Sequence, residues 1–495
     1  MLDGAEVAKH KTRESCWIVV DNRVYDVTTF LHRHPGGGAV LLRQGGADAT
    51  AEFSKVHPLD YVKELGEGSD LGPLDPKTTA SLNTPKPIPS QEVVNTDELP
   101  HVSLCVTTGD FEAPAKRVLP HRFWTYVSGS ANSGLSFKVN VDDWDRIRFR
   151  PRVLRNVGAV DMSRSVLGHK SPYPFYFTAI GTLGNIHPGA EPEAVRACVR
   201  KGVHQVISTA STKTPEETMD SYRREQSLVG DASPTRLFFQ LYLPTDREKA
   251  IALIKRAKAA GYKGIWLTVD TPVLGKRTAD RRLQAIEAAS MGLEQDEAPI
   301  RPPGSENSFA PAFGGRPVPG QLSPHTVWED LKWIKGAFDG PLVLKGIQCA
   351  EDAKLAMEYG CDGILLSNHG GRQLHSAPSA LMTLLEIRTY CPEVMDRMEV
   401  YVDGGLKDGA DVLKAICLGA TAVGVGRSYI YALAAYGSRG MERCTDILAE
   451  ELATAMKLLG ITSLDQARPE MVNANALLNE MWRPGANQLR ILSHL

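Results

Sequence analysis

The sequence predicts an α/β protein whose main domain is a TIM (β/α)8 barrel, preceded by a small α+β domain. From residue 173 onward, short apolar runs typical of buried strands alternate with segments whose apolar residues recur at helical spacing. Eight such units favour a closed parallel barrel, because a doubly wound open sheet seldom has so many even repeats. The expected strands are Pro174–Ala179, Gln205–Ser208, Leu237–Leu241, Ile265–Val269, Leu342–Lys345, Ile364–Ser367, Val400–Val402 and Ala422–Val425. The expected helices include Glu191–Lys201, Arg247–Ala260, Glu351–Tyr359 and Ala410–Leu418.

A connector rich in Pro, Ser, Thr and Asn precedes the barrel. It spans residues 75–100, and its composition predicts an exposed, extended linker. The chain therefore divides into a domain of residues 1–74, this linker, and a barrel domain with a C-terminal tail over residues 101–495. A long loop from about 271 to 323 interrupts the repeats, and its Pro/Gly-rich part predicts a mobile or disordered lid.

Composition excludes several classes of protein. The net charge of −2 gives no indication of binding to nucleic acid or to an anionic membrane. No apolar run reaches the roughly 18 residues that a spanning helix needs, and the N-terminus lacks the character of a signal or transit peptide. Eight cysteines without a C-x-x-C pair predict reduced thiols inside the cell. Because Ser493-His494-Leu495 resembles a peroxisomal address, we expect the cytoplasm or the peroxisome rather than the mitochondrial intermembrane space.

Two histidines stand out in the N-terminal domain. The runs Cys16–Val20 and Val24–Val27 predict two strands around a turn at residues 21–23. His34 and His57 each precede a proline, which tends to end or redirect a helix. Two histidines on separate loops can meet across a flat macrocycle and fill both axial positions of its iron.

The residues around these histidines resemble a cytochrome b5 domain. The resemblance rests on Cys16-Trp17, Val24-Tyr25-Asp26-Val27, Phe30-Leu31, His34-Pro35-Gly36-Gly37, Asp48-Ala49-Thr50 and Phe53 with His57-Pro58. It implies a non-covalent haem b whose iron is bound by His34 and His57. An iron with both axial positions filled by protein carries electrons and does not readily bind oxygen.

Polar residues recur where the predicted barrel strands end. Chemistry in such barrels lies at the C-terminal ends of the strands, so these residues predict an active site. They are Ser208, Gln240, Tyr242, Thr268, Asp270, Lys345, Asn368, His369, Asp403 and Arg427, with Arg277 in the loop after the fourth strand and with Gly404, Gly405 and Gly426 beside them.

Within this set, the stretch from Ser367 to Gln373 carries the most specific chemistry. His369 and Arg372 lie three residues apart with two glycines between them. An imidazole can take a proton near neutral pH, and a guanidinium can clamp a carboxylate. This pairing predicts removal of a proton from the carbon next to a carboxylate. Lys345 suits stabilisation of negative charge on a cofactor ring.

Glycine-rich turns after the last two strands predict a phosphate site, to which Gly404, Gly405, Gly426 and Arg427 would contribute. No G-x-G-x-x-G loop occurs, so a nicotinamide cofactor is not favoured.

Residues 101–482 resemble the FMN-dependent L-2-hydroxy acid oxidase and dehydrogenase family. The matching residues are Tyr126, Gln240-Leu241-Tyr242, Thr268-Val269-Asp270, Arg277, Lys345-Gly346, Ser367–Arg372 and Asp403-Gly404-Gly405. The resemblance implies FMN held by Ala179, Ser208, Gln240, Thr268, Lys345, Asp403, Gly404, Gly405, Gly426 and Arg427.

The family also implies roles for the catalytic residues. His369 would remove the proton from C2 of the substrate, and Asp270 would pair with it. Arg277 and Arg372 would bind the carboxylate with Tyr126 as a further donor, and Tyr242 would hydrogen-bond the substrate hydroxyl. Relatives of this kind are often tetramers, so we expect a homotetramer.

With the haem domain in front, the whole chain resembles the haem-linked dehydrogenases of this family. Electrons would then pass from FMN through haem b to an acceptor such as cytochrome c. The alternative is an oxidase of the same acids that uses oxygen and produces hydrogen peroxide. An electron carrier fused to an inactive barrel, or an isomerase acting on diphosphates, fits the complete catalytic set less well.

Four positions depart from the family pattern. Ala210 stands where relatives often carry Leu or Trp, which predicts a substrate larger than lactate. Lys407 stands where an arginine commonly reaches the flavin phosphate, and lysine lacks the fork geometry of arginine. His375 replaces a usual Asp, and Ser428 a usual Pro. The sequence leaves open which 2-hydroxy acid, acceptor and compartment apply.

Overall fold

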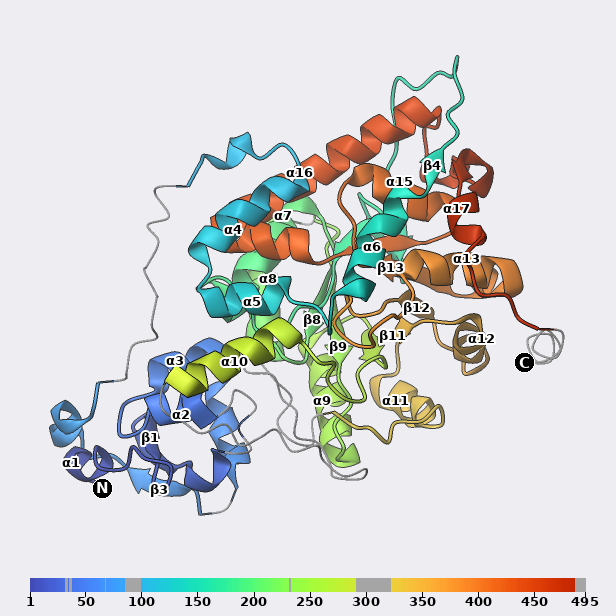
Figure 1. The fold of residues 1–495 in the computed structure, drawn as a ribbon. Helices are drawn as coiled ribbons and strands as arrows, with labels where there is room; N and C mark the ends of the chain where they lie inside the picture. Colours follow the sequence, from blue (N-terminus) through green and yellow to red (C-terminus); the bar gives the residue numbers. More distant parts are fainter. Residues whose placement is uncertain are drawn as a thin grey trace.

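The computed structural model describes residues 1–31, 34, 38–66, 68–84, 99–230, 233–290 and 322–485. Over these ranges the chain forms a small N-terminal domain and a closed parallel barrel, so the predicted fold class is confirmed (Figure 1). Most of the linker (residues 85–98), most of the expected lid (residues 291–321) and the C-terminal tripeptide lie outside the described residues.

The N-terminal domain is built on a three-stranded antiparallel sheet. Its strands are β1 (Trp17–Val20), β2 (Arg23–Asp26) and β3 (Asp70–Pro73), and its helices are α1 (Gly4–Val7), α2 (Gly38–Arg43) and α3 (Thr50–Val56). The first two strands agree with the prediction. The packing continues past residue 74, because Asn83 Nδ2 donates to the Ala8 carbonyl at 2.7 Å and Gly4 N donates to Thr78 Oγ1 at 2.8 Å.

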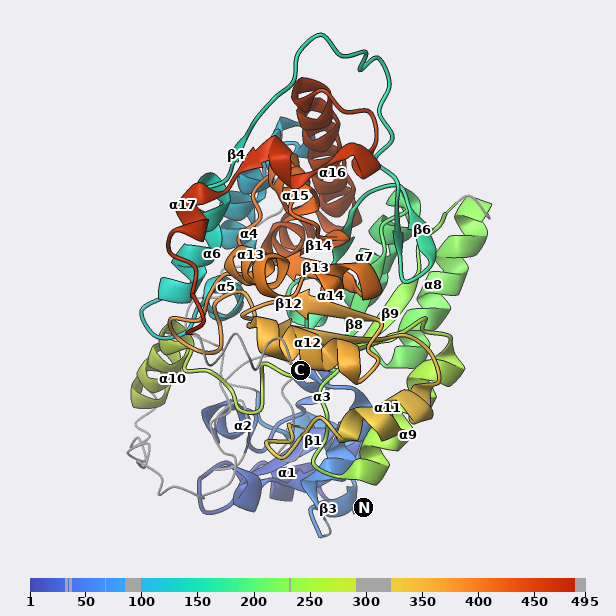
Figure 2. The same ribbon diagram turned by 90° about the vertical axis from the view of Figure 1, so that its right-hand side faces the viewer.

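Eight parallel strands close the barrel in chain order, with β14 pairing back to β7. They are β7 (Phe175–Phe177), β8 (Gln205–Ser208), β9 (Leu237–Leu241), β10 (Ile265–Thr268), β11 (Leu342–Ile347), β12 (Gly363–Leu366), β13 (Glu399–Asp403) and β14 (Ala422–Val425). Helices cover the outer side of the strands, as Figure 2 shows for α12 and α13. Because both faces of each strand are covered, the strands read as continuous apolar runs.

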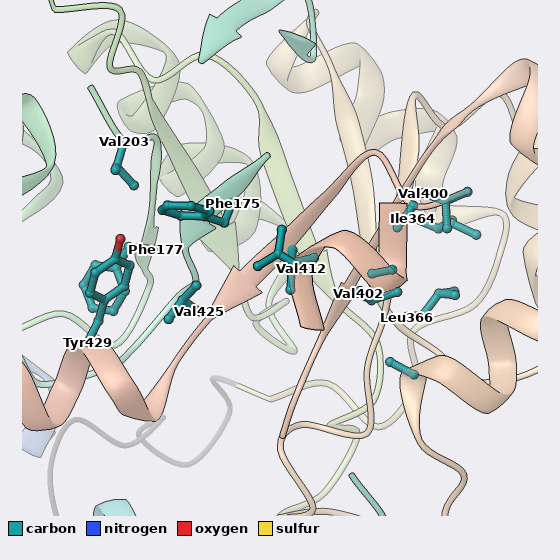
Figure 3. Close-up of a cluster of buried hydrophobic side chains, with 14 of the residues drawn as sticks. Phe175, Phe177, Val203, Ile364, Leu366, Val400, Val402, Val412, Val425 and Tyr429 are labelled. Carbon is teal, nitrogen blue, oxygen red and sulfur yellow. The ribbon is translucent and has the colours of Figure 1, made fainter. Parts of the chain in front are cut away.

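Alternate residues of each strand fill two separate layers of the core. One apolar side chain per strand forms a layer inside the barrel, where Tyr176, Trp266 and Tyr401 pack with ring centroids 4.9–5.8 Å apart. The other side chains pack outward against the helices, as Phe177 does against Tyr429 at a centroid distance of 5.4 Å (Figure 3).

The helices agree with those predicted to within one residue at each end. Those after the strands are α7 (Ala190–Lys201), α8 (Pro215–Val229), α9 (Arg247–Ala260), α10 (Thr278–Ser290), α11 (Asp330–Phe338), α12 (Ala350–Glu358), α13 (Ala380–Tyr390), α14 (Glu393–Arg397), α15 (Gly409–Cys417) and α16 (Arg427–Leu459). Helix α10 corrects the expected loop: it packs against α5, which gives this part of the segment a surface to fold on.

Short elements complete the two ends of the barrel. The hairpin of β5 (Arg164–Val166) and β6 (His169–Ser171) covers the N-terminal end, where Val166 joins the inner layer. At the opposite end, Ala131 N donates to the Gly371 carbonyl at 2.8 Å, which holds the α5–α6 connection against the loop after β12. The remaining elements are α4 (Glu112–Val118), α5 (His121–Ser128), α6 (Leu135–Asp145), β4 (Arg148–Phe149), β15 (Val472–Asn473) and α17 (Asn475–Leu478).

Candidate active site

The predicted polar residues meet at the C-terminal end of the barrel, starting with a buried chain of amide and hydroxyl groups. Ser208 Oγ donates to Gln240 Oε1 at 3.1 Å, and Gln240 Nε2 donates to Thr268 Oγ1 at 2.9 Å. Ser208 is the last residue of β8, Gln240 lies in β9, and Thr268 is the last residue of β10. The pairing of these neighbouring strands therefore aligns the three side chains. The arrangement presents a polar strip to whatever occupies the barrel mouth.

His369, Asp270 and Lys345 form the centre of the site. His369 Nδ1 lies 2.9 Å from Asp270 Oδ1, and Lys345 Nζ lies 3.2 Å from Asp270 Oδ2. On the other side of the ring, the Tyr242 hydroxyl lies 3.4 Å from His369 Nε2. The Asp270 side chain is completely buried, so we assign the imidazole tautomer with hydrogen on Nδ1, donating to the carboxylate.

The backbone of the loop after β12 aims the imidazole. His369 has a φ of 60°, and Gly370 and Gly371 continue this left-handed conformation. Only glycine adopts it without strain, so a left-handed histidine indicates a functional constraint. A Cβ at Gly371 would lie 2.4 Å from the Phe137 nitrogen, so glycine is also needed for the close packing of α6.

The charges of the site favour a neutral imidazole beside an ionised carboxylate. Burial lowers the pKa of His369 to about 4, opposed by Asp270 and reinforced by Lys345. Burial would raise the pKa of Asp270, but the neighbouring His369 and Lys345 outweigh it and hold that pKa below its usual range. At neutral pH the Nε2 atom of His369 therefore carries a lone pair that can accept a proton.

Arginines gather on the α5 side of the histidine. Arg372 and Arg277 stack against the Tyr126 ring, at 4.8 Å and 5.6 Å from its centroid. Burial and the charge of Arg277 lower the pKa of Arg372 to about 9. The Arg277 Nε atom is buried and has no hydrogen-bond partner in the part of the chain that the structure describes. Clustered cations with a buried unsatisfied donor favour an anionic ligand.

The other end of the mouth fits a flavin nucleotide. Asp403 Oδ1 is buried, and no partner for it occurs among the described side chains and backbone; an acceptor of this kind suits hydroxyl groups such as those of the ribityl chain of FMN. Gly404 and Gly405 take left-handed conformations, and a Cβ at Gly405 would lie 1.9 Å from the Asn140 carbonyl oxygen. A Cβ at Gly426 would meet only Thr178, at 3.6 Å, so the turn after β14 leaves space for a phosphate.

Two predicted phosphate ligands make other contacts here. The Arg427 guanidinium donates to the carbonyls of Val127, Gly129 and Gly370 at 3.1 Å and lies 4.5 Å from the Phe137 ring centroid. Lys407 Nζ lies 2.6 Å from Asp145 of α6. Apart from Gly370, these partners lie 262 to 300 residues away along the chain, so no local pattern in the sequence indicates them.

In the N-terminal domain, His34 and His57 face one another. Their ring centroids lie 6.4 Å apart, the separation that remains when a metal lies between them with bonds of about 2 Å on each side. Burial and His34 lower the pKa of His57 to about 3, which keeps it in the neutral form that binds metal. Phe30 lies against His34, and Phe53 and Tyr61 lie against His57. The pair and its aromatic surroundings fit a haem.

Comparison with protein families matches both domains. Residues 115–474 match the FMN-dependent dehydrogenase family, and residues 3–75 match the cytochrome b5-like haem/steroid binding domain. The chain belongs to the FMN-dependent dehydrogenase family. It carries FMN and haem b, and it is an FMN-dependent 2-hydroxy acid dehydrogenase. Among the described residues, no helix is long and apolar enough to cross a membrane.

Individual relatives separate the two predicted activities. L-lactate dehydrogenase (cytochrome) of Saccharomyces cerevisiae is 34% identical, over 96% of this chain and 80% of its own length. Human 2-hydroxyacid oxidase 1 is 35% identical, over 76% of this chain and 97% of its own length. The dehydrogenase thus matches nearly the whole chain, whereas the oxidase matches about three quarters of it.

Solved structures of related flavoproteins share the fold of the barrel. The flavin-binding domain of baker's yeast flavocytochrome b2 has a TM-score of 0.68 and 31% identity, covering 80% of this chain and 93% of that domain. A flavocytochrome b2 variant with benzoylformate has a TM-score of 0.67 and 32% identity, covering 78% of this chain and 94% of that one.

Sequence reasoning missed several residues of this dehydrogenase site. Thr271 Oγ1 donates to Asp270 Oδ1 at 2.7 Å. Asn140 of α6 exchanges two hydrogen bonds with Asn368, at 2.7 Å and 2.8 Å. The Gln373 amide binds the loop after β10. Thr271 and Gln373 each adjoin a predicted catalytic residue, and that adjacency was the available signal. Nothing in the sequence pointed to Asn140.

Proposed function

We propose that His369 is the base that removes the C2 proton of an L-2-hydroxy acid whose side chain is larger than the methyl group of lactate. The observation that carries the proposal is the neutral imidazole, bonded through Nδ1 to a buried carboxylate and exposing Nε2 between Tyr242 and the arginine cluster. When bound, FMN supplies a two-electron acceptor and haem b a one-electron carrier.

Each surrounding residue has a role that its contacts support. Arg277 and Arg372 bind the substrate carboxylate, the former through its unsatisfied Nε atom. Burial raises the pKa of Tyr242 well above its usual value, so its hydroxyl keeps a proton to donate to the substrate. Asp270 holds the imidazole in position and stabilises its charged form after proton uptake.

Two small residues support a large substrate. Ala210 follows β8 and Gly181 follows β7, and Thr182 N donates to the Ala210 carbonyl at 2.8 Å. A Cβ at Gly181 would lie 3.2 Å from the Ala210 Cβ, so the two positions face one another without bulk. We infer that this wall accommodates a branched or aromatic side chain. The flavocytochrome b2 variant that binds benzoylformate, an aromatic 2-oxo acid, is consistent with such substrates in the family.

We further propose cytochrome c as the electron acceptor, rather than oxygen. The haem domain supports this acceptor because haem is a one-electron carrier, and because α3 of that domain packs against the segment Leu183–Asn185, which follows β7 of the barrel.

We also propose a homotetramer. The loop after β4 projects beyond α16 (Figure 2) and exposes 80% of Val153 and all of Leu154, which provides apolar surface for self-association. Sedimentation analysis tests this assembly.

Substitution of His369 tests the central proposal. In His369→Gln the amide cannot accept a proton, so FMN should remain bound while its reduction by substrate is lost, by about 10³-fold or more. Stopped-flow absorbance of the flavin measures this under anaerobic conditions. His101→Gln, at an exposed histidine, is the control and should behave as the parent protein. Unchanged flavin reduction in His369→Gln would exclude His369 as the base.

A further inference from the structure

The two loops that carry the catalytic residues come from strands that are not neighbours. Asp270 follows β10 and His369 follows β12, and β11 lies between these strands in the barrel. Ladder hydrogen bonds therefore do not fix one loop against the other. Yet the proposed chemistry needs the Asp270 carboxylate and the His369 imidazole at hydrogen-bond distance, which is 2.9 Å here.

A buried amide behind the Asp270–His369 contact also joins the two loops directly. Gln373 Nε2 donates to the Asp270 carbonyl at 3.0 Å and to the Val273 carbonyl at 2.8 Å. Its Oε1 accepts from Gly275 N at 3.0 Å. Both amide hydrogens and the amide oxygen are thus used on one short segment, residues 270–275. The residue is 7% exposed, so water cannot easily replace these bonds.

The backbones of the two loops are also in close contact around this amide. A Cβ at Gly275 would lie 2.4 Å from the Arg372 carbonyl oxygen and 2.7 Å from the Gln373 Cα. Residues 270–275 lead directly to Arg277, while Gln373 directly follows Arg372. The same amide therefore sets the separation of the two arginines as well as that of the acid and the base.

We propose that Gln373 is a positioning residue of this dehydrogenase, whose amide holds the loop of Asp270 and Arg277 in register with the loop of His369 and Arg372. The proposal rests on the role proposed for His369. Gln373 does not contact the reacting groups; it acts through the backbone of Asp270. Supporting residues of this kind commonly change activity by about 10- to 100-fold.

Two substitutions test it. Gln373→Glu keeps the shape but places a carboxylate oxygen against two carbonyls in place of a donor. Gln373→Met removes all three hydrogen bonds without adding charge. We expect both holoenzymes to bind FMN and to show a kcat about 10- to 100-fold lower, with an increased deuterium isotope effect on C2–H cleavage.

The pH profile distinguishes positioning from a general structural role. Asp270 raises the pKa of His369, whereas Lys345 and Arg277 lower it, and Tyr242 lies on the far side of the ring. A looser contact with Asp270 should therefore move the acid limb of kcat/KM to lower pH. Gln226→Glu is the matched control. Gln226 lies on α8, away from the site, and its Nε2 donates to the Ser233 carbonyl at 2.8 Å. The acid limb of this variant should not move.

The outcomes are distinct. Parental kcat and isotope effect in both Gln373 variants, or loss of FMN from both, would overturn the proposal and leave Gln373 a packing residue. An unmoved acid limb together with lowered stability would do the same. If a 2-hydroxy acid reduces the parent enzyme but not His369→Gln, either of these outcomes in the Gln373 variants counts against the role of Gln373 alone and leaves the proposed function intact. If no 2-hydroxy acid reduces the parent enzyme, the proposed function itself fails.

Discussion

His369 can act as a base only while its imidazole is neutral, and its surroundings keep it neutral over a wide pH range. Burial lowers its pKa to about 4, and a group with a lowered pKa is deprotonated at every pH above that value. We expect kcat/KM to be flat near neutral pH and to fall as the pH drops through about 4. Stopped-flow flavin reduction measures the profile, with circular dichroism to establish that the protein is folded. An acid limb near the ordinary value of 6.5 would contradict the burial argument.

Ala210 gives a second prediction at the residue scale. Ala210→Leu adds three carbons to the wall opposite Gly181, so it should reduce kcat/KM for a branched or aromatic 2-hydroxy acid by about 10- to 100-fold. The rate with L-lactate should change by much less, because its methyl group does not reach the added side chain. Parallel assays with both acids measure the ratio. Ala259→Leu, on the exposed face of α9, is the control. A parent enzyme that prefers L-lactate would already contradict the proposed pocket.

At the scale of elements, an irregularity in β11 builds the contact between Lys345 and Asp270. The pairing of β11 with β12 shifts register between Lys345 and Ile347, and the residue between them, Gly346, has a φ of 112°. A Cβ at Gly346 would lie 2.5 Å from the Asp270 Cβ. Glycine at this position therefore lets β11 approach the loop after β10 closely enough for the ammonium group of Lys345 to contact the buried carboxylate of Asp270.

Gly346→Ala should displace Asp270 and so disturb the base. We expect flavin reduction to slow by about 100-fold, since a misplacement of about 1 Å can cost that much in catalysis, while the barrel remains folded. Flavin absorbance, reduction rate and thermal unfolding report these effects separately. Gly336→Ala in α11 is a matched control, because a Cβ there meets nothing within 4 Å; it should stabilise the protein slightly, by about 0.5–1 kcal/mol. Equal behaviour of the two variants would refute the role of Gly346.

At the scale of the whole molecule, substrate oxidation and electron delivery belong to different domains. His57→Ala removes one of the two residues that we expect to bind the haem iron, and it changes no residue of the barrel. We expect flavin reduction by substrate to stay within about 2-fold of the parent rate, while reduction of cytochrome c is lost. Simultaneous flavin and haem absorbance measures both steps, with His101→Ala as the control. Loss of flavin reduction in His57→Ala would mean that the domains depend on one another more closely than we propose.

Much of the architecture could be predicted because it depends on local pattern. A parallel barrel strand is buried on both faces, so it is a continuous apolar run, and a helix that covers it has apolar residues at helical spacing. The run Ile265–Thr268 and the helix Arg247–Ala260 follow these rules. Helix α10 was missed because it packs on α5, outside the regular repeat, and β3 was missed because it is short and pairs with a strand almost 50 residues earlier in the chain.

The sequence by itself determined which residue types stand at the strand ends, and from them the kind of chemistry, while its resemblance to two families implied FMN and haem b. Only the tertiary structure decided how those residues pair: Asp270 with His369 across β11, Asn140 with Asn368, Gln373 with the loop after β10, and Arg427 with the carbonyls at the end of α5. The physical reason is that hydrogen bonds and close packing depend on distances in space between segments about 100 to 300 residues apart, and no periodicity along the chain encodes those distances.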